Sequence, residues 1–195
     1  MTAITPLTPQ QIPELQPVLE MAEASMGFVP TSLLTMAHWP ELLPVFAGLA
    51  GTVLNGGELD RGLKQLIALL TSHAAGCRYC QAHTSHGAHR SDVAPEKIGA
   101  VFEYESSPLF SDAERAALRV AAHAGMVPNG VEASDMVSLR EHFSEKQCVE
   151  IVAVISLFGF LNRWNDTMAT TLEDQPMDFA HSQLTDIGWT PGKHG

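Results

Sequence analysis

The apolar residues of this chain recur at helical spacing, and the helical segments are interrupted at proline and glycine. In the stretch 59–75 the apolar side chains fall on one face of a helix, with members Leu59, Leu63, Leu66, Ile67 and Leu70. No segment is convincing as a β-strand. The pattern therefore predicts an all-α fold.

Proline, glycine and capping residues set the boundaries of the predicted helices. Asn55-Gly56-Gly57 is a clear stop, and Gly76 separates two helices. The predicted helices cover about 12–26, 30–38, 40–54 with Pro44 as a candidate kink, 59–75, 77–90, 92–102, 112–125, 132–142 and 144–172. We expect a single domain over residues 1–195 that ends in an irregular tail over 173–195.

Composition excludes several classes of protein. With 195 residues and 45% apolar content, the chain is long and apolar enough for one compact domain. The formal net charge of −11 argues against binding to nucleic acid or to anionic membranes, because no basic surface is available for phosphates. The N-terminus lacks a signal-peptide pattern, and the longest apolar run, 151–161, is too short to cross a bilayer. We therefore expect a cytoplasmic protein.

A faint internal repeat relates the two halves of the chain. Shifting the sequence by 85 positions, from 65 to 150, aligns two apolar stretches. The same shift aligns Cys77-Arg78-Tyr79-Cys80 with Asn162-Arg163-Trp164-Asn165. Two apolar helices can match by chance, but the Arg-aromatic pair in step favours a real repeat. In that case asparagines replace the thiols in the second half.

Two of the three cysteines form the Cys-x-x-Cys motif Cys77-Arg78-Tyr79-Cys80, with His83 three residues further on. In a reducing compartment this motif indicates redox chemistry or metal binding rather than a structural disulfide. The predicted helix start and Arg78 favour a thiolate. Cys80 can pass a proton to His83 and become nucleophilic, and Cys77 can then attack the oxidised Cys80 to form a disulfide.

Two other interpretations of the motif are available. Cys77, Cys80, His83 and His86 are ligand-type residues for zinc, but four ligands within ten residues of one helix cannot easily surround a metal. The thiols can also be inert core residues, as we expect for Cys148. The chain has no Gly-rich phosphate loop, so we expect neither a metal nor an organic cofactor.

At these residues the chain resembles the carboxymuconolactone decarboxylase superfamily, and in particular its alkylhydroperoxidase D-like, peroxidase-related branch. The resemblance rests on residues 66–88 with the Cys-x-x-Cys motif. It is supported upstream by His38-Trp39-Pro40-Glu41-Leu42-Leu43 and downstream by the stretch from His142-Phe143-Ser144 to Leu161-Asn162-Arg163. It covers roughly residues 28–172.

The resemblance implies an all-α fold of two related helical halves, homo-oligomeric assembly and reduction of hydroperoxides. It assigns the peroxidatic role to Cys80 and the resolving role to Cys77. The family's proton relay has a glutamate twelve residues before the first cysteine and a histidine four residues after the second. This chain has Gln65 and Thr84 there. We expect a relay rebuilt from His83, with support from Gln65, His73, His86 or Glu150.

The leading hypothesis is a thiol-dependent peroxidase that reduces a small hydroperoxide and is itself reduced by an unidentified dithiol donor. One alternative is a cofactor-free decarboxylase or lactone-processing enzyme of the same superfamily, using His83 and Arg163. A second alternative is a dithiol redox sensor that forms the Cys77–Cys80 disulfide without turnover.

Overall fold

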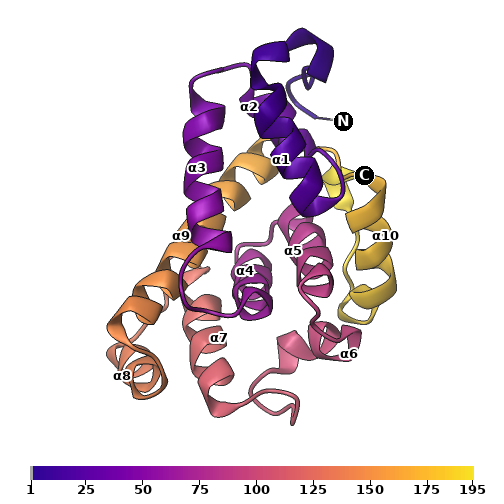
Figure 1. The fold of residues 1–195 in the computed structure, drawn as a ribbon. Helices are drawn as coiled ribbons and strands as arrows, with labels where there is room; N and C mark the ends of the chain where they lie inside the picture. Colours follow the sequence, from indigo (N-terminus) through magenta and orange to yellow (C-terminus); the bar gives the residue numbers. More distant parts are fainter. Residues whose placement is uncertain (1) are drawn as a thin grey trace.

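The computed structural model describes residues 2–195, and within this range it contains only helices, turns and loops (Figure 1). The all-α prediction is confirmed. The α-helices are α1 (Gln16–Met26), α2 (Thr31–Met36), α3 (Leu42–Asn55), α4 (Arg61–Ala74), α5 (Arg78–Arg90), α6 (Pro95–Gly99), α7 (Asp112–Ala124), α8 (Ala133–His142), α9 (Glu145–Met168) and α10 (Asp174–Gln183). Short 3₁₀ helices occupy Pro9–Gln11, Pro13–Leu15, Ala100–Glu103, Thr185–Ile187 and Gly192–His194.

Local sequence signals explain most helix ends. The Asp60 side chain accepts the Leu63 N–H at the start of α4, and Ser111 and Ser144 begin α7 and α9 as capping boxes. Gly76 has a φ of 76°, a conformation that favours glycine, and this residue separates α4 from α5. Pro44 does not kink α3, because the helix begins at Leu42 and the proline lies in its first turn.

The C-terminal tail is the main difference from the predicted fold. Residues 173–195 were expected to be irregular, and this prediction is wrong, because Asp174–Gln183 form α10. The helix is short and polar and carries a proline, so its sequence has only a weak apolar stripe. Its buried residues, Pro176 and Ala180, are small, and α10 packs alongside α5 (Figure 1).

The core is built around α4, which contacts α5, α7 and α9. The consecutive residues 66–69 are all buried, with at most 1% exposure, as expected for a helix covered on every side. A second apolar cluster joins α1, α2 and α3 to Leu157 of α9. These contacts fix α5 between the core helix α4 and the C-terminal helix α10.

Helix α9 contributes to both clusters, through Ile151 in the first and Leu157 in the second. It includes the apolar run 151–161 and is longer than that run. By length and composition alone α9 could cross a membrane, with a mean hydropathy of 1.2 over 18 residues. In this structure it packs against α3, α4, α5 and α7.

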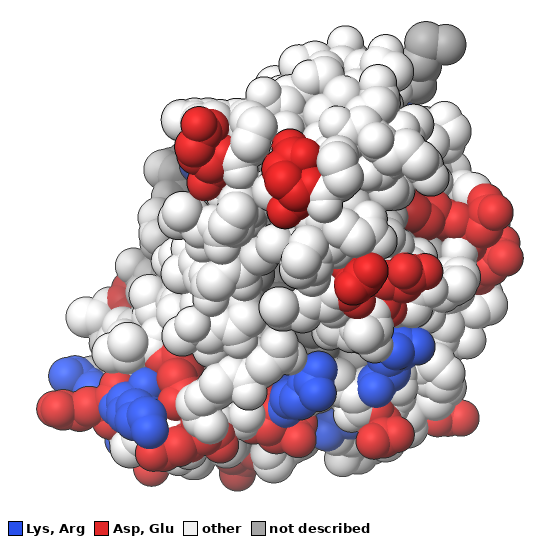
Figure 2. Space-filling view, turned by 45° about the horizontal axis from the view of Figure 1, so that its top comes forward, with Lys and Arg blue, Asp and Glu red and all other residues white. Residues whose placement is uncertain are grey.

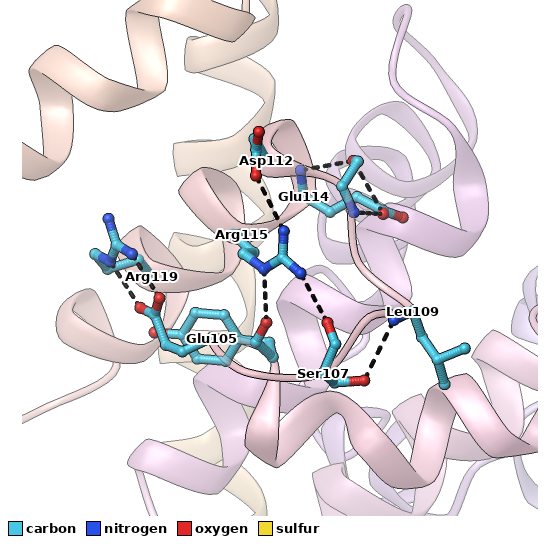
Figure 3. Close-up of polar contacts among 9 residues, drawn as sticks. Glu105, Ser107, Leu109, Asp112, Glu114, Arg115 and Arg119 are labelled. Atoms are coloured by element: carbon cyan, nitrogen blue, oxygen red, sulfur yellow. Dashed lines mark hydrogen bonds and ion pairs between the residues drawn. The ribbon is translucent and has the colours of Figure 1, made fainter.

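Charged side chains outside the core form local networks. Arg115 of α7 donates to the carbonyl oxygens of Tyr104 and Ser107 and to Asp112, which ties the preceding loop to the helix (Figure 3). On the face shown in Figure 2, the basic side chains gather along the lower edge among acidic ones, and most of the remaining surface is uncharged.

Candidate functional site

The turn between α4 and α5 places the Cys-x-x-Cys motif at a helix start. The Cys77 N–H donates to the Ser72 carbonyl at 3.1 Å, and Cys77 itself is the N-cap residue of α5. Both thiols are unoxidised and buried, with 0% exposure for Cys77 and 2% for Cys80. The predicted helix start at the motif is therefore confirmed.

The environment of the two thiols is unequal. A hydrogen bond from the Cys80 thiol lowers the pKa of Cys77 from its usual value, and the backbone N–H groups of Cys80 and Tyr79 act in the same direction against the effect of burial. Burial raises the pKa of Cys80 well above its usual value, and the hydrogen-bonded Cys77 raises it further. Cys77 is thus the thiol that ionises first. The family resemblance implies the opposite order, with Cys80 as the attacking thiol.

Helix α9 brings two asparagines to this region. Asn165 Nδ2 donates to Cys80 Sγ at 3.4 Å, and this amide acts to lower the pKa of Cys80. Asn162 lies one turn earlier and is also buried. The internal repeat aligns Asn165 with Cys80, the residue that it contacts. The two aligned stretches differ in backbone, because Gly76 interrupts the first whereas α9 is continuous.

His83 is held by a carboxylate from the C-terminal tail. Its Nε2 lies 2.6 Å from Glu173 Oε2, and its ring stacks on Tyr79 with 4.1 Å between centroids. Glu173 Oε1 also accepts from the Tyr79 hydroxyl at 2.9 Å and from the Thr31 N–H. Although burial acts to raise it, the pKa of Glu173 falls to about 2, because His83 and the Thr31 N–H stabilise the carboxylate.

Glu173 is the functional candidate that sequence reasoning missed. It lies 90 residues from His83 in a segment predicted to be irregular, so no local spacing pointed to it. Within residues 2–195, no hydrogen bond joins His83 to either thiol, in contrast to the direct proton transfer from Cys80 that the sequence suggested. The structure therefore places a hydrogen-bonded imidazole and carboxylate on the side of α5 that faces the tail.

The other predicted support residues lie elsewhere. Gln65 packs against Gly87, further along α5 than the thiols. Glu150 accepts the N–H groups of Glu58 and Leu59 and pairs with the buried Lys64 at 3.6 Å, so it stabilises the loop before α4. These contacts account for both side chains without the thiols.

The remaining histidine candidates have aromatic neighbours. His73 packs on Phe102 with 4.7 Å between ring centroids, and burial lowers the pKa of His73. His86 lies between Phe28 and Phe179, at 6.0 and 5.9 Å. Across residues 2–195 no three His, Cys, Asp or Glu side chains converge as metal ligands, so the zinc interpretation has no ligand set.

Two hollows approach the site. One, of about 120 Å³, lies at the start of α5 and includes Gly76 and Arg78, the neighbours of Cys77; the tail closes its other side with Ile187 and Trp189. The second, of about 530 Å³, lies between the N-terminal segment and α2 and includes Thr31, whose N–H binds Glu173. Neither thiol lines either hollow itself, but Cys77 lies between two lining residues of the first, and Glu173 is hydrogen-bonded to a lining residue of the second.

Comparisons with known proteins identify the family and the fold of this chain. Residues 40–123 match the Carboxymuconolactone decarboxylase family. The crystal structure of the debrominase Bmp8 is similar over 96% of this chain and 98% of that chain, with 37% identity and a TM-score of 0.87. A cysteine-to-alanine variant of Bmp8 has been crystallised with 2,3,4-tribromopyrrole.

One more distant solved structure shares the fold, and one curated protein matches part of the sequence. A peroxidase-related protein from Ralstonia eutropha JMP134, described as an alkylhydroperoxidase AhpD core, superposes with a TM-score of 0.80 over 92% of this chain and 95% of that chain, at 23% identity. The YnjA protein of Escherichia coli K12 is 31% identical over 110 residues, which are 56% of this chain and 60% of YnjA. The chain thus spans less than two thirds of the length of that relative. The chain belongs to the carboxymuconolactone decarboxylase superfamily and has the fold of its alkylhydroperoxidase D-like branch.

Proposed function

We propose that this protein is a thiol-dependent oxidoreductase in which Cys77 and Cys80 reduce a small substrate and become a disulfide. The observation that carries the proposal is the pair of buried, unoxidised thiols at the start of α5, where the pKa of Cys77 is lowered and that of Cys80 is raised. One thiol is thereby ready as a nucleophile while the other keeps its proton. A separate, unidentified dithiol reductant would reduce the disulfide back to two thiols.

A hydroperoxide is the first candidate substrate. The Cys77 thiolate attacks the terminal oxygen of ROOH, the S–O bond forms, the O–O bond breaks, and the alkoxide leaves as ROH after taking a proton. Cys80 then attacks the Cys77 sulfur, the S–S bond forms, and the S–O bond breaks to release water with the Cys80 proton. The substrate gains two electrons and the two thiols lose them.

His83 is the candidate source of the proton for the leaving group. It follows Cys80 by three residues on α5, and Glu173 holds its ring at 2.6 Å. A carboxylate partner fixes the orientation of an imidazole. In this role His83 replaces the family's glutamate–histidine relay, because this chain has Gln65 and Thr84 at those two positions.

Reductive dehalogenation is the second candidate, favoured by the similarity to the debrominase Bmp8 over nearly the full chain. The balance uses the same dithiol: an aryl bromide and two thiols yield the arene, bromide, a proton and a disulfide. Reduction of a bromopyrrole therefore takes two electrons from the dithiol, as reduction of a hydroperoxide does. The two substrates differ in size and in the bond that breaks.

The test is turnover with dithiothreitol as the reductant, using tert-butyl hydroperoxide and 2,3,4-tribromopyrrole in parallel. We expect one of them to be consumed catalytically by the native protein and by Cys148→Ser, whose thiol lies in the core away from the motif. Cys80→Ser should stop turnover. Full turnover by Cys80→Ser would overturn the proposal, and muconolactone conversion that survives loss of both motif cysteines would favour the decarboxylase alternative.

We also propose that the protein forms a homo-oligomer through α3 and α9. These two helices are in contact, and each exposes large apolar side chains: Val45 and Leu49 on α3, and Val152 and Phe160 on α9. A second copy would cover them. Light scattering after size exclusion should show a dimer or larger, and a monomer at micromolar concentration would contradict this assembly.

A further inference from the structure

The buried amides of α9 have hydrogen-bonding capacity that the fold does not use. Asn162 and Asn165 are only 4% and 1% exposed. Among the described residues, six buried side-chain nitrogen or oxygen atoms have no partner within the protein, and three of these are Asn162 Nδ2, Asn162 Oδ1 and Asn165 Oδ1. Because an unpaired buried amide destabilises the folded state, stability alone does not explain these residues.

The position of Asn165 connects this unused capacity to the dithiol. Its Nδ2 donates to Cys80 Sγ at 3.4 Å. The Oδ1 atom belongs to the same amide group, so a hydrogen-bond acceptor without a protein partner lies beside the sulfur. Asn162, one helical turn away on the same buried side of α9, adds two donor hydrogens and another acceptor.

Both candidate substrates carry a hydrogen-bond donor next to the bond that is reduced. A hydroperoxide has an O–H on the oxygen that the thiolate attacks, and 2,3,4-tribromopyrrole has a ring N–H beside a C–Br bond. An amide that accepts this X–H group while it donates to Cys80 Sγ would hold the reducible bond against the dithiol.

We propose that Asn162 and Asn165 form an amide subsite that binds the O–H or N–H group of the substrate beside the dithiol. This inference rests on the proposed oxidoreductase function and names the residues that position its substrate. The subsite occupies the positions that the internal repeat aligns with the two cysteines. One copy of the motif supplies the electrons, and the other supplies the contacts that orient the substrate.

Access to the subsite is through the hollow at the start of α5. Gly76 and Arg78 line this hollow on either side of Cys77, and the tail residue Trp189 covers it, donating from Nε1 to the Arg78 carbonyl at 3.3 Å. Arg78 in turn donates to the tail carbonyls at 3.4 Å. For a substrate to pass from this hollow to the thiols, these long hydrogen bonds and the packing of the buried Trp189 would have to open.

The first test uses Asn162→Leu, which replaces an unpartnered amide by an apolar group with the same number and branching of heavy atoms. Because no hydrogen bond within the protein is lost, the urea midpoint should be unchanged or higher than that of the native protein. The kcat/KM for the preferred substrate should fall about tenfold, the loss expected for one substrate hydrogen bond. Asn129→Ala, which removes an exposed turn contact to the Val131 N–H, should leave kcat/KM unchanged.

The opposite pattern would overturn the subsite. If Asn162→Leu is less stable than the native protein but keeps its kcat/KM, the amide has a structural role only. Asn165→Leu gives a second variant in case one substitution prevents folding.

A binding test separates the subsite from the proposed function. In Cys77→Ser, which keeps the Asn165–Cys80 contact, the Kd of 2,3,4-tribromopyrrole is compared with that of its N-methyl derivative. We expect N-methylation to weaken binding about tenfold, and to have no effect once Asn162→Leu is added. Equal affinity for the two pyrroles with both amides present would overturn the subsite for this substrate class.

The hydroperoxide arm uses kinetics alone, with tert-butyl hydroperoxide and the same pair of variants. A tenfold loss there, without any preference between the pyrroles, assigns the subsite to the O–H of a hydroperoxide. A preference for the N–H pyrrole that depends on the amides, in a protein that turns over neither substrate, would sustain the subsite and overturn the oxidoreductase proposal.

Discussion

The polar side chains around α7 and the buried asparagines of α9 differ in how completely they are hydrogen-bonded. Arg115 and Arg119 of α7 find acceptors for their guanidinium groups, and Arg119 binds both oxygens of Glu105 at 2.8 and 2.6 Å (Figure 3). Asn162 and Asn165 of α9 are far more buried and yet leave three atoms without partners.

This difference separates polar groups that complete the fold from those kept for chemistry. The network at α7 is closed, since Arg115 pairs with Asp112 three residues away and Arg119 pairs with Glu105 fourteen residues away. The amides at α9 keep unpaired atoms beside the dithiol, where Asn165 contacts Cys80. A fold maintains such unpaired groups at a cost to its stability, and functional sites are where that cost is usually found.

The largest expected effect comes from replacing one cysteine of the dithiol, and it tests which of the two thiols attacks the substrate first. In the absence of reductant, Cys80→Ser should consume one equivalent of the preferred substrate and leave Cys77 oxidised. Cys77→Ser should consume none, a loss of at least about 1,000-fold in the rate of the first step. The physical reason is that Cys77 ionises first, because the Cys80 thiol and the α5 backbone N–H groups stabilise its thiolate.

The measurement is substrate consumption together with intact-protein mass. Cys148→Ser is the matched control and should behave as the native protein does. A single equivalent consumed by Cys77→Ser and none by Cys80→Ser would reverse the roles and restore the order that the family resemblance implies.

The second prediction concerns Glu173, a carboxylate that is fully paired, in contrast to the amides of α9. Its pKa is about 2 in the folded protein and close to 4.5 when unfolded, so the folded state binds this proton more weakly. The corresponding stability is fully present above pH 4.5 and is lost as the pH falls toward 2. Glu173→Gln should therefore lower the free energy of unfolding by about 3 kcal/mol at pH 7.

Urea unfolding at several pH values checks this expectation. The difference between the native protein and Glu173→Gln should shrink as the pH is lowered from 4.5. Asp174→Asn, a change at the neighbouring exposed position, should have little effect. A stability difference that stays constant down to pH 2.5 would contradict the assignment of this ion pair.

The two regions also differ in how well the sequence predicts them. The fold, the capping box at Ser111 and the helix start at Cys77 follow from residues within a few positions of each other. Local rules of spacing and capping apply there. The Cys-x-x-Cys motif was identified for the same reason.

The contacts that complete the site join distant segments. Glu173 lies 90 residues from His83, and Asn165 lies 85 residues from Cys80. No local pattern can predict such pairs. The internal repeat did align Asn165 with Cys80, so one signal for the second pair was present in the sequence, although it carried no information on contact.

The third prediction tests Glu150, the carboxylate that the sequence suggested for the relay. It accepts hydrogen bonds from the N–H groups of Glu58 and Leu59 and pairs with Lys64. Glu150 is therefore fully paired, like the charged groups around α7. Glu150→Gln should lower stability by roughly 1 kcal/mol, as expected for a weakened cap, and leave kcat unchanged. A fall in kcat with unchanged stability would place Glu150 in the chemistry instead.

The smallest expected effect belongs to Arg119, at the surface of the α7 network. Its side chain and that of Glu105 are partly exposed, at 35% and 49%, so water and salt weaken their attraction. Arg119→Ala should lower the free energy of unfolding by roughly 1 kcal/mol or less, and the loss should diminish at 1 M salt.

Turnover and thiol reactivity should not change, because this network has no unpaired group directed at the dithiol. Thermal unfolding at low and high salt provides the measurement. A loss of several kcal/mol that salt does not reduce would show that the α7 network is as tightly coupled to the core as the site on α5 and α9.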